Sequence, residues 1–275
     1  MKIIEIFKSL QGEGPKIGSP SLFLRLCGCN MKCRFNCNSS KDIEKLETEW
    51  NTEIEAVNNG AELKDLRLLN SGCDSYPAIL PDIYNKIAKD YTDEEIIKII
   101  LNTEAQCIIW TGGEPLLQYK KIKSIKEKVL EEVKKDLILF NFFKRTWWFE
   151  TNGTVDIQEA VRDYNFIVIC PKINYMSLKQ KEVFYNNVKF AREDISKNCI
   201  YFKFVVQNSQ QLEELLEYEG WIKQVKNKVY IMPQGSQLDE DFLKRSTDIA
   251  NKCIDLGLNF TPRLQNYLWK NDWGK

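Results

Sequence analysis

Histidine is absent from the 275-residue sequence. Because histidine is the commonest general base near neutral pH and a frequent zinc ligand, its absence excludes hydrolytic sites built on His–Cys or His–Asp pairs. The 39 basic and 39 acidic residues give a formal net charge of zero, so charge provides no argument for binding of nucleic acid or of an anionic membrane. The N-terminus has no long apolar run, and the chain has no repeat. We therefore expect a soluble, cytoplasmic protein with neither a membrane nor a nucleic acid as direct partner.

The length and the hydrophobic fraction of 43% suit one large domain over residues 1–275. Nine cysteines without a signal peptide indicate reduced thiols or metal ligands rather than disulfides. Four of them lie in apolar or helical stretches and are expected to be small buried residues: Cys107, Cys170, Cys199 and Cys253. The other five lie in turn-rich stretches: Cys27 (at a strand end), Cys29, Cys33, Cys37 and Cys73.

Strand-like and helix-like stretches alternate along most of the chain. The expected strands cover residues 2–7, 20–26, 106–110, 146–150, 166–170, 200–206, 228–232 and 258–262. The expected helices cover residues 94–102, 116–135, 156–163, 209–218 and 238–256. This alternation predicts an α/β fold with a parallel sheet, either doubly wound or curled into a barrel.

Polar turns, three of them with glycine, follow the expected strands: TGGEP, ETNGT, CPK, VVQN, MPQG and PRLQ. In a parallel barrel the carboxyl ends of the strands gather on one face, so these turns favour a partial parallel β/α barrel with its site on that face. The cysteine loop also follows a strand and is expected to open there. Residues 34–72 are more acidic than basic and show little periodicity, so we expect a polar surface insertion outside the core.

Cys29 and Cys33 are separated by three residues on one loop. Two thiolates so close can bind neighbouring corners of one iron–sulfur cluster, and a third thiolate would leave one iron open for chemistry. A zinc site more often has two intervening residues and a second such pair, which this sequence lacks. The turn Gly112-Gly113-Glu114-Pro115 is by itself an ordinary tight turn, but it becomes specific when it lies beside such a cysteine loop.

At this point the sequence resembles the radical S-adenosylmethionine superfamily and, within it, the family of 7-carboxy-7-deazaguanine synthases. The resemblance is carried by EIFKSLQGEG (residues 5–14), FLRLCGCN, TGGEPLLQ (111–118), ETNGT (150–154) and CPK (170–172), and more loosely by FKFVV and TPRLQ. These stretches span nearly the whole chain apart from residues 34–72. The QGEG stretch discriminates best, because most of the superfamily lacks it.

The resemblance implies a partial barrel of the radical SAM type that holds a 4Fe–4S cluster. S-adenosylmethionine would bind the cluster's fourth iron, and an electron from an external, flavodoxin-like donor would cleave it to a radical that abstracts hydrogen from the substrate. The implied substrate is 6-carboxy-5,6,7,8-tetrahydropterin. Its ring contraction, with loss of ammonia, gives 7-carboxy-7-deazaguanine for queuosine-type biosynthesis and makes the enzyme a carbon–nitrogen lyase. Mg²⁺ and a homodimer are also implied.

The third cluster cysteine departs from the family pattern, which leaves two residues between it and the second and follows it with Asp and Thr. Here Cys37 comes one residue too late, whereas Cys73-Asp74-Ser75 reproduces the Cys-Asp-hydroxyl pattern further on. We predict Cys73 as the third ligand, with residues 34–72 inserted between the second and third ligands, and keep Cys37 as the alternative. Long loops add little closure entropy, so such an insertion is tolerable. By position, Ser75 would take the magnesium role, as a hard oxygen ligand.

The remaining site residues follow from the resemblance, position by position. The implied contacts to S-adenosylmethionine are Gly72, Asp74, Gly112, Gly113, Glu114, Cys170, Pro171, Lys172, Met232 and Gln234. The implied substrate contacts are Leu10, Gln11, Gly12, Glu13, Arg25, Thr111 and Gln265. Arg25 suits a carboxylate because its guanidinium can donate two parallel hydrogen bonds. Cys170 replaces the serine usual in the family, which leaves it a backbone contact.

Two other functions remain open. A glycyl-radical activase would use the same cluster chemistry on a protein partner, although QGEG and ETNGT argue against it. A non-catalytic zinc-binding protein would use the cysteines structurally.

Overall fold

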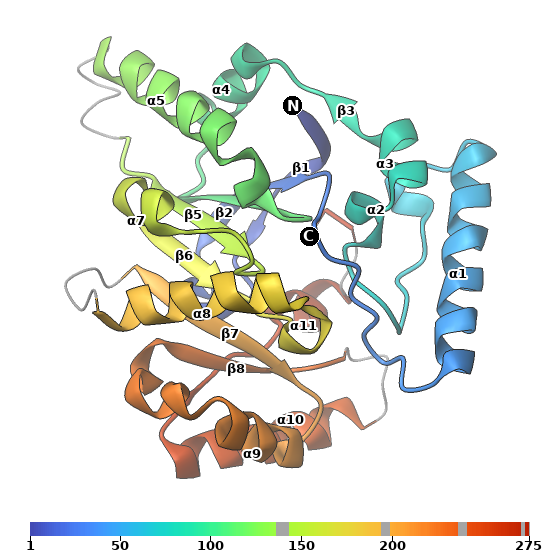
Figure 1. The fold of residues 1–275 in the computed structure, drawn as a ribbon. Coiled ribbons are helices and arrows are strands. Elements are labelled where there is room, and N and C mark those ends of the chain that lie inside the picture. Colours follow the sequence, from blue (N-terminus) through green and yellow to red (C-terminus); the bar gives the residue numbers. More distant parts are fainter. Residues whose placement is uncertain (136–142, 194–198, 236–240, 271–272, 275) are drawn as a thin grey trace.

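The chain forms one open, curled sheet with helices on its outer face and a group of helices at one side (Figure 1). A computed structural model describes residues 1–135, 143–193, 199–235, 241–270 and 273–274. The strands are β1 (Lys2–Leu10), β2 (Pro20–Leu26), β3 (Lys89–Asp90), β4 (Cys107–Gly112), β5 (Thr146–Thr151), β6 (Phe166–Ile169), β7 (Ile200–Val206), β8 (Val229–Pro233) and β9 (Asn259–Phe260). In the described part of the chain they follow the order β3-β1-β2-β4-β5-β6-β7-β8-β9.

The sheet is parallel from β2 to β9, and β1 runs antiparallel to both β2 and β3. No ladder joins β3 to β9 among the described strands, so the barrel is open, as the sequence predicts. The loop after β1 nevertheless meets the segment after β9. The amide of Leu264 donates to the carbonyl of Gly12 at 3.0 Å, and the amide of Gly14 donates to Oγ1 of Thr261 at 2.8 Å. Loops therefore bring the two ends of the curled sheet together beside the carboxyl ends of the strands.

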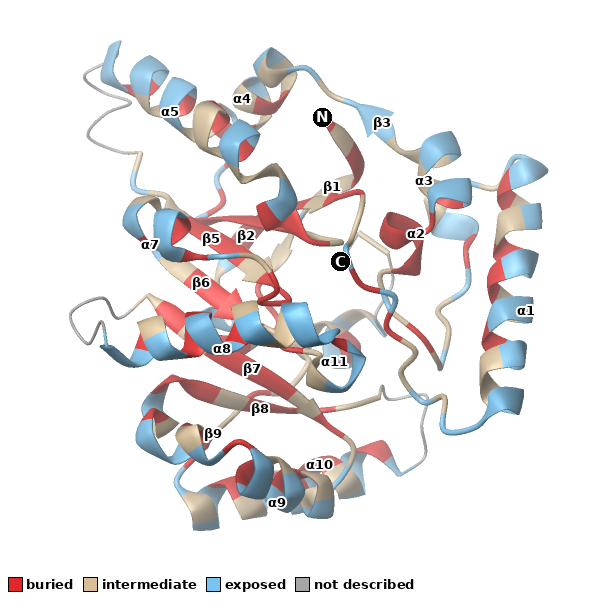
Figure 2. Cartoon of the chain, viewed as in Figure 1, coloured by how far each residue is buried: buried red, intermediate tan, exposed pale blue. Residues whose placement is uncertain are grey.

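The helices are α1 (Ser40–Asn58), α2 (Tyr76–Ile79), α3 (Pro81–Ile87), α4 (Asp93–Leu101), α5 (Tyr119–Lys135), α7 (Gln158–Asp163), α8 (Leu178–Glu193), α9 (Ser209–Tyr218), α10 (Phe242–Leu256) and α11 (Leu264–Trp269). Helices such as α5 and α8 turn one buried stripe toward the sheet and an exposed stripe outward (Figure 2). In α5 the buried stripe is Ile122, Ile125, Val129 and Val133, which has the spacing of one helical face.

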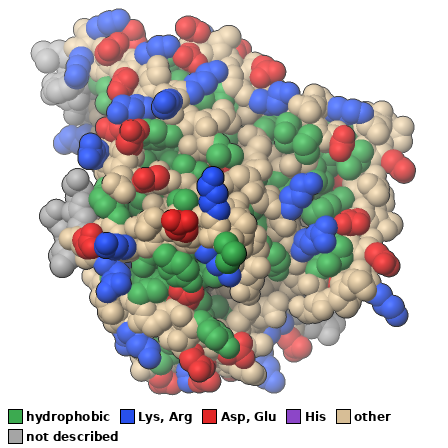
Figure 3. Space-filling model, viewed as in Figure 1, with side chains coloured by type: hydrophobic (Ala, Val, Ile, Leu, Met, Phe, Trp, Pro, Cys, Tyr) green, Lys and Arg blue, Asp and Glu red, His purple; other side chains and the backbone are tan. Residues whose placement is uncertain are grey.

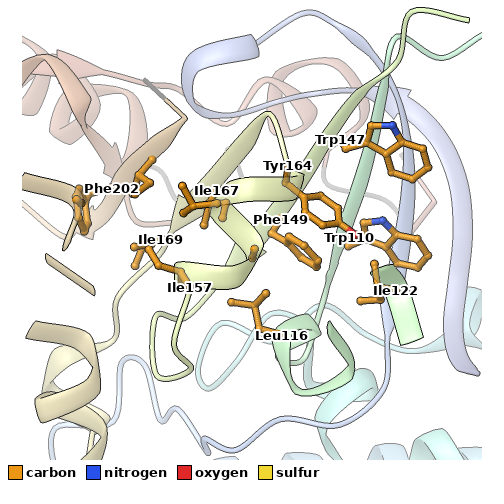
Figure 4. Close-up of a cluster of buried hydrophobic side chains, with 14 of the residues drawn as sticks. Trp110, Leu116, Ile122, Trp147, Phe149, Ile157, Tyr164, Ile167, Ile169 and Phe202 are labelled. Atoms are coloured by element: carbon orange, nitrogen blue, oxygen red, sulfur yellow. The ribbon is translucent and has the colours of Figure 1, made fainter. Parts of the chain in front are cut away.

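Large apolar side chains fill the space between the sheet and these helices (Figure 4). Trp110 of β4, Phe149 of β5 and Phe202 of β7 have no exposed surface, and Ile122 of α5 packs in the same cluster. This core holds the strands rigidly, so that the turns at their carboxyl ends are presented from a firm base.

The helices α1, α2 and α3 lie together at one side of the sheet, in what we call the side limb (residues 34–87; Figure 1). The expectation of little periodicity in residues 34–72 is wrong for α1. Leu46, Trp50, Glu53 and Val57 make one buried stripe along α1, and Ser39 caps this helix through a capping box with Asp42. The stripe contributes to a separate apolar cluster with Leu66, Tyr76, Ile79, Leu80 and Ile83.

Most of the other predicted elements agree with the structure to within a few residues. Strand β7 and helix α9 have the predicted bounds, and β1 continues three residues further than expected. Helix α8 was not predicted, and the expected helix 238–256 is seen from residue 242, its first residues lying partly outside the described ones. No helix among the described residues is long and apolar enough to cross a membrane. Basic and acidic side chains are interspersed on the face shown in Figure 3.

Candidate active site

A cavity of about 350 Å³ opens at the carboxyl ends of the parallel strands. Its wall combines the loop after β2, the turns after β4, β5, β6 and β8, the start of the segment after β9, and the side limb. Most of the site residues predicted from the sequence line it: Leu10, Gln11, Gly12, Glu13, Arg25, Cys29, Cys33, Gly72, Cys73, Asp74, Ser75, Thr111, Gly112, Gly113, Cys170, Lys172, Met232, Gln234 and Gln265. Glu114 and Pro171 do not line the cavity and are buried behind it.

Of the four cysteines that line this cavity, three are the predicted cluster ligands: Cys29, Cys33 and Cys73. Burial raises the pKa of all three, that of Cys33 to about 11. The thiols also lie close enough to act on one another, because a charge on Cys29 raises the pKa of Cys33 and charges on both raise the pKa of Cys73. Binding to iron would displace the protons from these thiols.

The other two cysteines of the turn-rich stretches lie outside the cavity wall. The thiol of Cys37 contacts the carbonyl oxygens of Phe35 and Asp42 and packs against the side limb. Cys27 is buried between Ile4 and Ala78, where burial raises its pKa to about 12. This placement favours Cys73 over Cys37 as the third thiolate, and the ligand assignment stays a prediction.

The three thiols suit a cluster better than a single ion. Within the described part of the chain, no three cysteine, aspartate or glutamate side chains lie close enough to hold one metal ion. In a 4Fe–4S cluster each cysteine binds a different iron, so three thiols around one cavity fit such a group.

The glycine turn after β4 packs directly on the cysteine loop. Leu26 and Gly112 are paired in the parallel ladder, and the amides of Gly113 and Glu114 donate to the carbonyls of Leu26 and Gly28 at 3.0 and 2.9 Å. A Cβ on Gly113 would lie 1.9 Å from the Gly28 carbonyl oxygen. The sequence reading assigned these glycines to a close approach of S-adenosylmethionine. The structure adds that they are required for contact between two backbones.

Glu114 fixes this turn from behind. Its carboxylate accepts hydrogen bonds from the amide of Leu116 at 3.0 Å, from Oγ1 of Thr151 at 2.8 Å and from the amide of Asn152 at 2.7 Å. Burial raises the pKa of Glu114 to about 7, although these three donors lower it. Glu114 therefore anchors the turn after β4, as the sequence predicts, and joins it to the turn after β5.

The turn after β5 also holds the cysteine loop. The side-chain amide of Asn152 donates to Oδ1 of Asn30 at 3.1 Å and lies 3.7 Å from the thiol of Cys29. Nδ2 of Asn30 in turn donates to Oγ1 of Thr154 at 2.8 Å. The ETNGT stretch thus orients the first cysteine, a role that the sequence reading did not give to Asn152.

Buried ion pairs make up the opposite wall. Lys203 of β7 donates to Glu13 at 2.5 Å and lies 3.7 Å from Glu150, and Arg263 lies 3.3 Å from Glu13. Burial alone would raise the pKa of Glu13, but the positive charges of Lys203 and Arg263 outweigh this effect and lower the pKa to about 2. Burial would lower the pKa of Lys203, yet Cys170, Glu13 and Glu150 raise it well above its usual value. Glu13 and Lys203 are therefore both charged at neutral pH.

Hydrogen bonds join the predicted substrate contacts to Glu150. Its carboxylate accepts from Nε2 of Gln11 at 3.1 Å and from Oγ1 of Thr111 at 3.4 Å. Nε2 of Gln265 donates to Glu13 at 2.7 Å, while the described residues offer its buried Oε1 no partner. This oxygen packs against Gly12, where a Cβ would lie 1.8 Å from it.

Arg25 lies on the same wall, next to the third cysteine. Its Nε donates to Glu5 at 2.6 Å and its Nη1 donates to Oγ of Ser75 at 2.8 Å. Burial would lower the pKa of Arg25, but Glu5 and further carboxylates raise it. A permanent cation and a hydroxyl oxygen are therefore adjacent, as a bound carboxylate with a magnesium ion would need.

Sequence reasoning missed Lys203, Glu150 and Glu5 as site residues. Lys203 carries one usable signal, since it is the only charged residue in the strand IYFKFVV. A lysine there either faces solvent or has a buried partner. Its partner Glu13 lies 190 positions away in the chain, and no local pattern links the two.

Comparisons with known proteins agree with this geometry. A family model described as a 4Fe-4S single cluster domain matches residues 10–186. A relative named 7-carboxy-7-deazaguanine synthase, from Hyperthermus butylicus, is 28% identical over 270 residues, covering 96% of this chain and 91% of its own. Another of that name, from Pyrobaculum aerophilum, is 26% identical, covering 100% of this chain and 97% of its own.

The fold has a solved counterpart in QueE from Escherichia coli. The match has a TM-score of 0.53 at 16% identity and covers 95% of this chain and 92% of the other. At that identity the likeness concerns the fold. The family model spans well over half of the sequence and includes Cys29, Cys33 and Cys73. The chain therefore belongs to the family of 4Fe-4S single cluster domains.

Proposed function

We propose that this protein is a radical SAM enzyme, 7-carboxy-7-deazaguanine synthase. It would convert 6-carboxy-5,6,7,8-tetrahydropterin to 7-carboxy-7-deazaguanine with loss of ammonia, in a single domain whose residues 34–72 are inserted between the second and third cluster ligands. The observation that carries the proposal is the meeting of three thiols, a backbone-tight glycine turn and buried ion pairs around one cavity. Relatives with that name align with nearly the whole chain.

Cys29, Cys33 and Cys73 would hold the 4Fe–4S cluster through three of its irons. The turn after β4, the Cys170-Pro171-Lys172 stretch and the Met232–Gln234 end of β8 would bind S-adenosylmethionine beside it. When bound, the cluster and S-adenosylmethionine supply one-electron chemistry that abstracts a hydrogen atom from the substrate. The cavity volume of about 350 Å³ lies in the range of small-molecule sites.

The protein's own residues would bind and orient the pterin. Glu13 is ionised at neutral pH because its pKa is held at about 2, so it can accept hydrogen bonds from the amino edge of the ring. Arg25 would face the substrate carboxylate, and Ser75 would provide an oxygen ligand to a magnesium ion. Gln11 and Thr111, both bonded to Glu150, would line the ring.

The remaining parts of the proposal concern partners. An external one-electron donor of the flavodoxin type would reduce the cluster, and two chains would form a homodimer in the cytoplasm.

Anaerobic reconstitution with iron and sulfide, followed by turnover, tests the proposal. We expect a brown protein with about four irons per chain that forms 7-carboxy-7-deazaguanine from the pterin, S-adenosylmethionine and a reductant. A colourless protein that retains zinc would contradict the proposal. A cluster-bearing protein that cleaves S-adenosylmethionine but leaves the pterin unchanged would contradict the substrate and favour an activase.

A further inference from the structure

The C-terminal segment contacts the chain on both sides of Cys73. On the downstream side, Nη2 of Arg263 lies 3.1 Å from Oδ2 of Asp74. On the upstream side, Nε1 of Trp273 donates to the carbonyl of Leu66 at 2.9 Å. The Trp273 ring also packs edge-on against the ring of Tyr76, with centroids 6.5 Å apart.

The chain after Cys73 has its own bonds to the sheet. Ser75 accepts a hydrogen bond from Arg25 of β2, and the carbonyl of Ala78 accepts one from the amide of Gly28 at 2.8 Å. These bonds fix the downstream side of Cys73 relative to the other two cysteines.

The chain before Cys73 is bonded differently. The amide of Gly72 donates to the carbonyl of Phe35 at 2.8 Å, and the amide of Arg67 donates to Glu53 at 3.1 Å. Both of these partners belong to the side limb itself. The bond from Trp273 to Leu66 instead joins this stretch to a segment 207 residues away.

Trp273 also lies between two hollows. Together with Gly274 and Glu5, it lines both the candidate active site and a neighbouring groove bordered by Val57, Lys64 and Ile87. Its side chain therefore separates the cavity that contains Cys73 from a second opening on the side limb.

We propose that Trp273 is a positioning residue for Cys73. It holds the stretch before Cys73 against the body of the protein and keeps the neighbouring groove apart from the cluster cavity. The proposal rests on the proposed function in one respect, namely that Cys73 is the third cluster ligand. The contact itself involves Leu66 and Tyr76 and no cluster ligand, so it can be tested separately.

The first measurement uses the apo-protein and a thiol reagent. In the Trp273→Ala variant we expect iodoacetamide to modify Cys73 about tenfold faster than in the wild type, because local opening now exposes it. Modification of the buried Cys107 and Cys253 stays at the wild-type rate, as followed by peptide mass spectrometry. Leu268→Ala, a half-exposed position on the same segment, is the matched control and leaves all rates unchanged.

Trp273→Phe provides a second, milder variant. It keeps an aromatic ring against Tyr76 but removes the donor to the Leu66 carbonyl, so Cys73 becomes reactive to an intermediate degree. This variant keeps the test decisive should Trp273→Ala fail to fold.

The second measurement uses the reconstituted protein with an iron chelator. We expect Trp273→Ala to lose iron faster than the wild type, by a factor similar to that for thiol modification. An unchanged rate at Cys73, or equal increases at Cys107 and Cys253, would overturn the proposal whatever the enzyme does. Selective exposure of Cys73 without faster iron loss from a cluster-bearing protein would also overturn it. Selective exposure in a chain whose wild type binds no cluster would leave the contact standing and refute the proposed function instead.

Discussion

The parallel array and the side limb both contribute cysteines to one cavity, but they hold them by different means. The array places Cys29 and Cys33 on a loop that extends directly from β2 and is bonded to the turns after β4 and β5. The side limb places Cys73 at the end of its own small apolar cluster. Backbone ladders therefore fix the first two thiols, whereas side-chain packing and the C-terminal segment fix the third.

This difference separates two consequences of a substitution. A change in the array disturbs ladder bonds and the main core, so it lowers the stability of the whole fold. A change in the side limb disturbs a small unit with few contacts to the sheet, so it opens locally while the barrel stays folded. Global stability and cluster retention should accordingly respond independently in the two regions.

The sharpest test of this difference is the removal of single thiols. Cys73→Ala is expected to lose the cluster and all turnover while its unfolding midpoint in urea changes little, since the side chain is small and lies at the cavity wall. Cys37→Ala is the matched control from the same limb, and it keeps its iron because its thiol faces carbonyl oxygens. The iron and sulfide contents of both variants after anaerobic reconstitution measure how much cluster each retains. Retention in Cys73→Ala with loss in Cys37→Ala would reverse the assignment.

The next largest effect belongs to the array. In Gly113→Ala the new Cβ meets the Gly28 carbonyl oxygen, which is backbone and can yield only by moving the cysteine loop. We expect a loss of about 3 kcal/mol in the free energy of unfolding, together with weaker cluster binding. Gly220→Ala has open space around its Cβ and is the matched control, expected within about 0.5 kcal/mol of the wild type. Equal unfolding midpoints in urea for the two variants would show that the turn after β4 and the cysteine loop are not tightly coupled.

The same difference explains what the sequence could predict. The strands and helices of the array repeat one apolar pattern and end in polar turns, so β7, α9 and the common face of the turns follow from local signals. Helix α1 was not predicted because its buried stripe includes Glu53 and is interrupted by many charged residues. Its apolar side is recognisable only when Leu46, Trp50 and Val57 are read at helical spacing.

The site divides in the same way. The cysteines, the glycine turn and Gln11 belong to contiguous motifs and were predicted, whereas their supports were not. Lys203 meets Glu13, and Trp273 meets Tyr76, through contacts between distant parts of the chain. Such pairs depend on how the sheet curls and on where the C-terminal segment crosses it, and no local pattern encodes either.

A smaller effect is expected at Glu13, which joins the loop after β1 to β7 and to the segment after β9. Its folded-state pKa, about 2, lies below the unfolded value near 4.5, so its contribution is complete above pH 4.5 and is lost as the pH falls toward 2. Glu13→Gln should cost roughly 2 kcal/mol at pH 7, because the amide keeps an acceptor but leaves Lys203 with only the more distant carboxylate of Glu150. Urea unfolding between pH 7 and 3 should show the two proteins converging on acidification. A constant difference in the free energy of unfolding over this pH range would show that the ionised carboxylate of Glu13 is not the source of the stabilisation.

The smallest effect is expected at Glu53, the buried carboxylate inside the side limb. It accepts hydrogen bonds from the backbone amide and from Nε of Arg67, whose side chain is more than half exposed, so solvent weakens the ion pair. Glu53→Gln keeps an acceptor for the amide, and we expect a loss of roughly 1 kcal/mol or less in global stability. Hydrogen exchange should nevertheless quicken in α1 and in the stretch that ends at Cys73, while β4 to β8 keep their protection. Faster exchange spread evenly over the barrel would mean that the limb and the array unfold as one unit, and the proposed independence of the third cysteine would then fail.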